Sequence, residues 1–236
     1  MLCKIADLIT EVPDAGSMAP RCEEYQWHED QHPDIAIDAK EYDPTRYPAF
    51  WNQESVAYME SARFFYRQLL DHDGFYLHSS AIALDGKAYL FSGPSGMGKS
   101  THTRLWQQIF GSAAQVFNDD KPALRCLDGV WYAYGTPWCG KDHINVNRKV
   151  PLAGICFLEQ SSENVIRRLP QAEAAMRIIS QTIRYFANEE RLDLMLNHVQ
   201  RLVKTIPVYE LKNRPEPAAA MLSFETMLAG AKENGL

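Results

Sequence analysis

Residues 93–100, GPSGMGKS, most constrain the fold of this 236-residue chain, because they match the pattern G-x-x-x-x-G-K-[ST] at every fixed position. An apolar segment, residues 87–92, precedes them, and a segment with helical character, residues 101–110, follows them. Glycines in this setting let backbone amides point at phosphate oxygens, and the following helix adds its positive end. The sequence therefore predicts a strand, a phosphate-binding loop (P-loop) and a helix in succession.

The loop predicts ATP and Mg²⁺ as cofactors. The ammonium of Lys99 is expected to reach the β- and γ-phosphates, and the hydroxyl of Ser100 to ligate the metal. The alternative is a glycine-rich turn with an incidental lysine. The residues expected to contact the nucleotide are Gly93, Pro94, Ser95, Gly96, Met97, Gly98, Lys99, Ser100 and Thr101.

Two adjacent carboxylates, Asp119 and Asp120, follow a short apolar segment at residues 114–118. A phosphate-bound Mg²⁺ usually needs a carboxylate ligand, and such ligands collect at strand ends in α/β sheets. Neighbouring residues of an extended chain point to opposite sides. One carboxylate can then face the metal while the other faces an acceptor, unless the chain turns there. The alternative is an ordinary Asn-Asp-Asp turn.

The remaining pattern predicts an α/β protein with a mixed β-sheet flanked by helices. Asp85-Gly86 and Asp128-Gly129 are hairpin signals, which argue against an all-parallel sheet. Strands are expected over residues 2–12, 34–39, 75–84, 87–92, 114–118, 150–158 and 206–211, with a hairpin over 123–134 and a turn over 13–20. Helices are expected over residues 52–70, 101–110, 170–203 (two, split near Asn188) and from 215 onward.

We expect a single domain over residues 1–236. It would have a β-rich N-terminal part (1–50), a nucleotide-binding core (75–160) and a mainly helical C-terminal part (165–236). The net charge of −6 gives no electrostatic footprint for nucleic acid. The five cysteines form no C-x-x-C pair, and no segment approaches the roughly 18 apolar residues of a membrane span. The sequence therefore predicts a cytoplasmic protein with no membrane or nucleic-acid partner.

The stretches HSSAIALDGKAYLFSGPSGMGKST and VFNDDKPAL resemble the catalytic domain of HPr kinase/phosphorylase, which shares a fold group with ATP-dependent phosphoenolpyruvate carboxykinase. The resemblance covers roughly residues 75–160. The late segment IPVYEL and the terminal helices look like those of small kinase-like relatives found beside peptide-modification genes, including lasso-peptide kinases.

The resemblance implies that His78 lies near the phosphates, that Asp119 is the general base and that Asp120 is a metal ligand; the two aspartates can be exchanged in these roles. The family's Arg-Gly signature loop is not recognisable. In its place stands GTPWCGK, residues 135–141, where Thr136 and Lys141 are expected to contact the acceptor or the γ-phosphate. The alternative is a surface turn around a buried Trp138. The family is also known for hexamers, so a homo-oligomer stays open.

These features favour a kinase that transfers the γ-phosphate of ATP to a hydroxyl, with a serine of a peptide or small protein as the favoured acceptor. Two alternatives stay open. One is a nucleotide-responsive protein that binds a partner without transferring phosphate. The other is a kinase for a small metabolite, or carboxykinase-like chemistry.

Overall fold

The computed structural model describes residues 1–13, 18–140, 143–182 and 189–236. One long strand, β10 (Lys149–Gln160), organises the main sheet. Its first residues pair antiparallel with β9 (Val130–Tyr134). Its later residues lie parallel to β6 (Lys87–Ser92) on one side and to β12 (Val208–Asn213) on the other. The sheet around β10 is therefore mixed, as the hairpin signals predicted.

The strand order is β4-β8-β9-β10-β6-β5-β7, and β12 and β11 continue the sheet from the far part of β10. Hairpins supply the antiparallel neighbours: β5 pairs with β6, and β8 with β9. The remaining strands of this sheet are β4 (Gly74–Tyr76), β5 (Ser79–Leu84), β7 (Gln115–Asp120), β8 (Ala123–Leu127) and β11 (Val165–Arg168).

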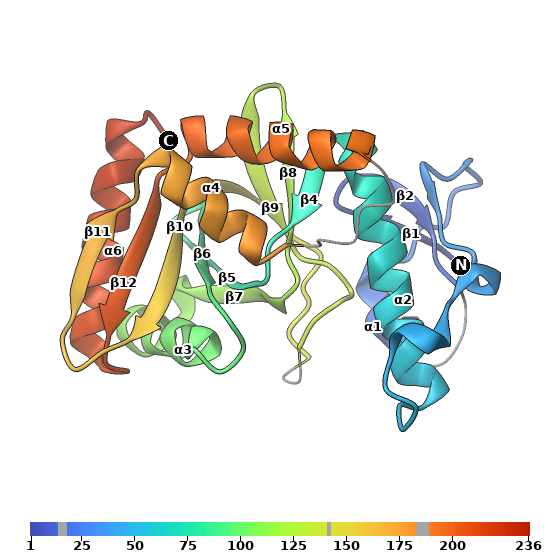
Figure 1. Ribbon diagram of the computed structural model, residues 1–236, viewed down its shortest axis with the longest axis horizontal. Helices are drawn as coiled ribbons and strands as arrows, with labels where there is room; N and C mark the ends of the chain where they lie inside the picture. Colours follow the sequence, from blue (N-terminus) through green and yellow to red (C-terminus); the bar gives the residue numbers. More distant parts are fainter. Residues whose placement is uncertain (14–17, 141–142, 183–188) are drawn as a thin grey trace.

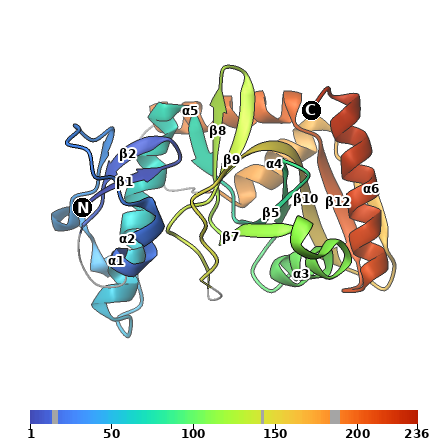
Figure 2. The same ribbon diagram turned by 180° about the vertical axis from the view of Figure 1, so that it is seen from behind.

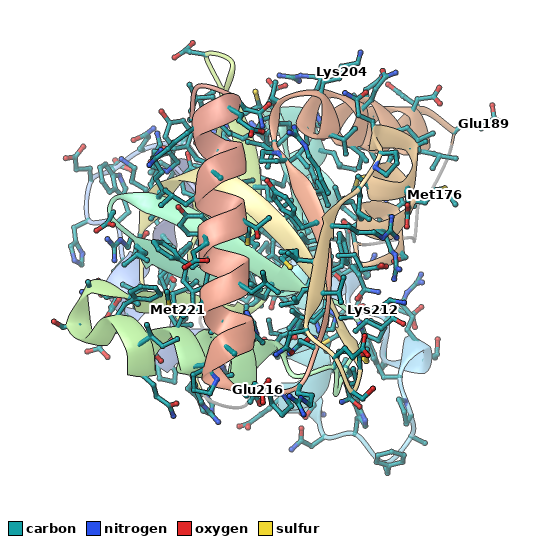
Figure 3. The ribbon with its side chains drawn as sticks, turned by 90° about the vertical axis from the view of Figure 1, so that its left-hand side faces the viewer. Met176, Glu189, Lys204, Lys212, Glu216 and Met221 are labelled. Atoms are coloured by element: carbon teal, nitrogen blue, oxygen red, sulfur yellow. The ribbon has the colours of Figure 1, made fainter. Side chains whose placement is uncertain are left out.

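Helices cover both faces of the part of the sheet that contains β5, β6 and β10, which explains the continuous apolar runs in these strands. On β5, Ala81 and Ala83 join the core formed with α4 (Gln171–Ser180) and α5 (Glu189–Thr205). The alternate residues, Ile82 and Leu84, join the core formed with α3 (Lys99–Phe110) and α6 (Pro217–Glu233). Figures 1 and 2 show the strands between the helices, and Figure 3 shows α6 in front of them, beginning beside Glu216.

A small N-terminal sheet and α2 (Gln53–Gln68) lie at the end of the molecule opposite α6 (Figure 1). The side chain of Asn52 caps α2 by accepting a hydrogen bond from the amide of Ser55. The buried Trp138 joins the core of this unit, which links it to the main sheet. The other elements of the unit are β1 (Leu2–Ile5), β2 (Leu8–Glu11), β3 (Ile35–Ala36) and α1 (Met18–Arg21). Short 3₁₀ helices in the chain span Glu23–Tyr25, Ala39–Glu41, Pro44–Arg46, Leu69–His72 and Gly111–Ala113.

Three sequence-based expectations need correction. The single strand expected over residues 75–84 is two strands, β4 and β5, which pair with different neighbours and are separated at Leu77 and His78. The strand expected over residues 2–12 is a hairpin, turned at Ala6 and Asp7 with φ of 53° and 60°. The edge strand β11 was not expected at all. The predicted split near Asn188 lies outside the described residues. Of the turn expected over 13–20, residues 14–17 also lie outside them, and residues 18–20 belong to α1.

In the part of the chain that the structure describes, no helix combines the length and apolar character that crossing a membrane requires.

Candidate functional site at one edge of the sheet

Strand pairing brings the candidate residues to one edge of the sheet. Strand β5 runs antiparallel to both β6 and β7, so β6 and β7 run in the same direction. Their carboxyl ends therefore meet the start of β5 at one edge. The predicted phosphate loop follows β6, the two aspartates end β7, and His78 immediately precedes β5. The edge thus assembles groups that are separated by up to 42 positions in the sequence (120 − 78).

The loop after β6 has a backbone that requires its glycines. Gly93, Gly96 and Gly98 have φ of 143°, 83° and 91°, in the region that L side chains rarely adopt. A Cβ atom on Gly93 would also lie 3.3 Å from the carbonyl oxygen of Leu158. Helix α3 begins directly after the loop, at Lys99, so its unpaired N-terminal amides face the loop. A loop with this backbone conformation can bind an anion through its own amides and those of the first turn of α3.

The Lys99 side chain is folded back onto the loop. Its Nζ atom donates to the carbonyl oxygens of Gly93 at 3.0 Å and Pro94 at 3.3 Å. Among the described residues, no carboxylate lies within ion-pairing distance of this ammonium group, although Lys99 is only 9% exposed. Burial lowers the pKa of Lys99, and the charges of Asp120 and Asp119 oppose that shift. A phosphate would give this buried cation a direct counter-charge.

A β-bulge sets the direction of Asp119. The register between β5 and β7 shifts between Ala81 and Ile82, which leaves Phe117 as the extra residue. Asp119 then pairs with Ser80, whose hydroxyl lies 3.1 Å from that of Thr103 on α3. Because paired residues share a face of the sheet, Asp119 lies on the α3 face, where the loop is. Its side chain is 7% exposed, and within the described residues its carboxylate has no hydrogen bond or ion pair.

Asp120 is held in a different way. Its Oδ1 atom lies 2.9 Å from Nε2 of His78, and its Oδ2 atom bonds the ammonium of Lys121. The Nδ1 atom of His78 in turn lies 3.1 Å from Oε1 of Gln181. Burial alone would raise the pKa of Asp120, but the His78 hydrogen bond and the Lys121 charge hold it well below its usual range. The chain also turns at Asp120, whose φ is 114°. We call Asp120, His78, Lys121 and Gln181 the Asp120 cluster.

Two members of the Asp120 cluster were missed by sequence reasoning. Lys121 directly follows the aspartate pair, so its position was a usable signal. Gln181 follows α4 and lies 103 positions beyond His78, and no motif marks it.

Residues 135–140, the described part of the predicted 135–141 loop, pack against the segment that carries Lys121. The hydroxyl of Thr136 donates to the carbonyl oxygen of Lys121 at 2.8 Å and lies 2.9 Å from that of Tyr66. Thr136 has no exposed surface, so this geometry gives no support to its predicted contact with the acceptor or the γ-phosphate. Its predicted companion, Lys141, lies outside the described residues. Trp138 is fully buried, as the alternative interpretation required, but residues 135–139 are all buried, so the described part of this loop is not the surface turn of that interpretation.

A hollow of about 440 Å³ adjoins the loop on the side of α6 and is of a size that accepts part of a nucleotide. Gln160, at the end of β10, donates from Nε2 to the carbonyl oxygen of Gly96 at 3.2 Å, which joins the two walls. Thr101 is exposed and Ser100 partly so. The lining residues are Gly96, Met97, Gly98, Thr101, His102, Gln160, Ser161, Asn213 and Pro215.

The donor set fits Mg²⁺ held mainly by phosphate. Within the described residues, no group of three or more His, Cys, Asp or Glu side chains is arranged to hold a metal ion. Mg²⁺ is commonly bound through one or two protein oxygens together with substrate phosphates and water. The hydroxyl of Ser100 and one carboxylate of the aspartate pair would be sufficient for that mode.

The comparisons with known proteins identify a family and, among solved structures, a distant likeness. A solved structure titled "Structure of the Hpr(Ser) kinase/phosphatase from Coxiella burnetii" is similar at 11% identity, with a TM-score of 0.37, over 66% of this chain and 95% of that one. No curated protein matches the chain.

The family comparison covers most of the chain. The model of the SynChlorMet cassette protein ScmC matches residues 48–214, a span that contains the loop, both aspartates and the whole Asp120 cluster. The chain therefore belongs to the family of the SynChlorMet cassette protein ScmC.

Proposed function

We propose that the protein is an ATP- and Mg²⁺-dependent kinase that transfers the γ-phosphate to a hydroxyl group. The observation that carries the proposal is the shared sheet edge. It unites a glycine loop, a buried ammonium on Lys99 and a buried carboxylate on Asp119, and neither charged group has an ionic partner among the described residues. The resemblance of residues 75–160 to HPr kinase/phosphorylase supports the same assignment. A serine of a peptide or small protein is the favoured acceptor.

Asp119 has the properties of the general base. Its carboxylate lies on the α3 face beside the loop, and no described side chain occupies it. It would take the proton of the acceptor hydroxyl while the new O–P bond forms and the bond from the γ-phosphorus to the β,γ-bridging oxygen breaks, so that ADP leaves with that electron pair. Lys99 would turn from the loop carbonyls to the phosphates and neutralise the charge that develops on them.

Of the two aspartates, Asp120 is the better candidate for the metal ligand. Its low pKa keeps it ionised, as a ligand must be, and a base of such low pKa accepts a proton poorly. His78 and Lys121 orient its carboxylate. Ser100, on the first turn of α3, would supply the second protein oxygen. Bound Mg²⁺ would supply positive charge that neutralises the phosphates.

The test is incubation with γ-labelled ATP, Mg²⁺ and a panel of serine peptides, with the label located by mass spectrometry. We expect label on a peptide hydroxyl and a loss of about 10²- to 10⁴-fold in Asp119→Asn, with ATP binding retained. Asp193→Asn, an exposed position on α5, is the matched control and should transfer at the rate of the unchanged protein. Transfer by Asp119→Asn at the full rate would remove Asp119 as base. ATP binding with no transfer to any acceptor would favour a nucleotide-responsive binding protein.

A further inference from the structure

A second hollow, of about 600 Å³, opens beside the Asp120 cluster, and we call it the aromatic hollow. One of its lining residues, Lys121, belongs to that cluster; Thr182 directly follows Gln181, and Tyr76 lies two positions before His78. The hydroxyl of Thr182 donates to the carbonyl oxygen of Tyr76 at 2.6 Å, and the ammonium of Lys121 bonds Asp120. A molecule bound in this hollow therefore lies next to the site where we place phosphate transfer.

The walls of the aromatic hollow are ring systems. Tyr47 and Trp51 are stacked, with ring centroids 5.3 Å apart and an interplanar angle of 14°. Tyr66 and Tyr76 lie 4.8 Å apart at 35°. The hydroxyl of Tyr66 already donates to the carbonyl oxygen of Lys121 at 2.5 Å, so its ring is fixed in place. Such walls suit an aromatic side chain, because ring pairs add attraction beyond their buried area.

A buried carboxylate fixes one wall in advance of binding. Glu60, on α2, has no exposed surface and accepts from the hydroxyl of Tyr47 at 2.7 Å and from the amide of Asp43 at 3.1 Å. Both of its oxygens also accept from the guanidinium of Arg63, at 2.8 and 2.7 Å. The segment that carries Tyr47 is therefore tied to α2, which lowers the ordering cost of binding.

The apolar surface continues past the aromatic hollow, which favours an extended chain over a single small molecule. Trp51 also lines a neighbouring hollow of about 650 Å³, together with Tyr42, Val56 and Ala57. Phe50, next in the chain, is 85% exposed. The two hollows share the indole of Trp51, and together they form a longer binding surface than one small molecule would fill.

The charged residues that line the aromatic hollow are cations, and each of them is already paired with a carboxylate. Arg46, Arg63 and Lys121 line it, and none of its lining residues in the described chain is Asp or Glu. The side chain of Arg46 is 48% exposed, and its partner Asp43 is the N-cap of the 3₁₀ helix that ends at Arg46. Glu60 and Asp120 neutralise Arg63 and Lys121, whereas the exposed pair of Arg46 with Asp43 is weak in water. Arg46 is therefore the cation with which an acidic residue of the bound chain can pair.

We propose that the aromatic hollow binds an acceptor peptide through an aromatic side chain near the phosphorylated hydroxyl, with an acidic residue toward Arg46. This proposal rests on the proposed function, since docking there would hold the peptide hydroxyl at the sheet edge that carries Asp119 and Asp120. The anchor side chain would lie between the Tyr47–Trp51 pair and Tyr66.

The test measures binding separately from transfer. The probes are fluorescein-labelled nonapeptides with a central serine and with aspartate and glycine at the other positions. In each peptide one of these other positions, different in each, carries phenylalanine. The protein is titrated into each peptide, and binding is followed by fluorescence anisotropy. We expect the best register to bind at least about tenfold more tightly than the same peptide with alanine for phenylalanine. Trp51→Ala should remove that preference, while Tyr132→Ala, a half-buried aromatic of β9 outside the hollow, should keep it.

Three results would overturn the proposal: equal binding of the phenylalanine and alanine peptides, an unchanged preference in Trp51→Ala, or competition by N-acetylphenylalaninamide as strong as that of the peptide. The same peptides are then offered with labelled ATP. Tight, Trp51-dependent binding without transfer would retain the docking surface and refute the kinase assignment. Equal rates of phosphate transfer to the phenylalanine and alanine peptides would support the kinase assignment and refute the docking surface.

Discussion

Lys99 is an ammonium group whose present partners are neutral oxygens. It is nearly buried, it donates to the carbonyls of Gly93 and Pro94, and burial lowers its pKa. A buried cation without a direct counter-ion costs folding free energy, and proteins tolerate that cost where a ligand supplies the missing charge. The residue is therefore better suited to binding an anion than to stabilising the loop.

Replacing Lys99 by methionine separates these two roles. We expect Lys99→Met to weaken ATP binding by at least about tenfold, which corresponds to about 1.4 kcal/mol, because a charge-assisted contact to phosphate is lost. The free energy of unfolding should not fall, since the change removes a desolvated charge. Titration with a fluorescent ATP analogue and urea unfolding measure the two quantities. Lys204→Met, an exposed position on α5 labelled in Figure 3, is the control. A destabilised variant with unchanged affinity would contradict this prediction.

Some residues of the site could be predicted from the sequence and others could not, for physical reasons. The loop and the aspartate pair are local patterns in the sequence, and the backbone of the loop requires its glycines, as the positive φ of Gly96 shows. The face on which Asp119 lies depends on the bulge at Phe117, which alternation alone does not reveal. Gln181 reaches His78 only through the packing of α4 on the sheet, and no local signal encodes such a contact.

At the scale of elements, the junction between α3 and α6 depends on one hydroxyl. Ser223 of α6 donates to the carbonyl oxygen of Ala220 and accepts from Nε1 of Trp106 at 3.0 Å. Nε2 of His102 lies 2.9 Å from the same oxygen, so the imidazole is arranged as the neutral tautomer that donates from Nε2. Its buried Nδ1 atom has no partner among the described residues. Protonation there would create a buried donor without an acceptor.

This arrangement makes the α3–α6 junction sensitive to acid. Burial lowers the pKa of His102 from 6.5 to about 4, so below pH 6.5 the unfolded chain binds a proton that the folded chain does not. The contribution of neutral His102 to the free energy of unfolding is therefore complete above pH 6.5 and is lost as the pH falls toward 4. We expect a loss of about 2 kcal/mol between pH 7 and pH 5 from His102, measured by urea unfolding at both values. In His102→Gln the loss should be smaller by that amount; an equal loss in both proteins would contradict the prediction.

Element prediction succeeded where a pattern is local. Asp85-Gly86 and Asp128-Gly129 turn hairpins as expected, with φ of 50° and 74° at the first pair and 50° and 82° at the second. It failed at residues 75–84, where two apolar stretches flank the polar residues 78–80 and the chain leaves β4 after Tyr76 and enters β5 at Ser79. It also missed β11, a short and mostly exposed edge strand whose pairing with β12 is tertiary.

At the scale of the molecule, the N-terminal unit and the main sheet share a core. Trp138, which follows β9, is fully buried, and its ring lies 4.7 Å from that of Phe65 on α2. Its Nε1 atom donates to the hydroxyl of Ser61 on α2 at 3.0 Å. Arg125 of β8 adds a polar link, because its Nη1 atom donates to the carbonyl oxygen of Ala6 in the first hairpin at 2.7 Å. These contacts cross from one part of the fold to the other, so the two parts should unfold together.

Trp138→Ala tests that coupling. The change removes a fully buried indole and leaves the hydroxyl of Ser61 without its donor, so we expect a loss of about 3–5 kcal/mol in the free energy of unfolding. Met176→Ala, at a 70% exposed side chain that Figure 3 labels on α4, should change it by less than about 0.5 kcal/mol. Circular dichroism and tryptophan fluorescence during urea unfolding measure both. In the unchanged protein the two signals should have one midpoint, since the N-terminal sheet, α2 and the main sheet bury Trp138 jointly. Two separate midpoints would show that the N-terminal unit unfolds independently. The aromatic hollow takes its walls from that unit and from the main sheet, so it would then be lost before the sheet edge itself.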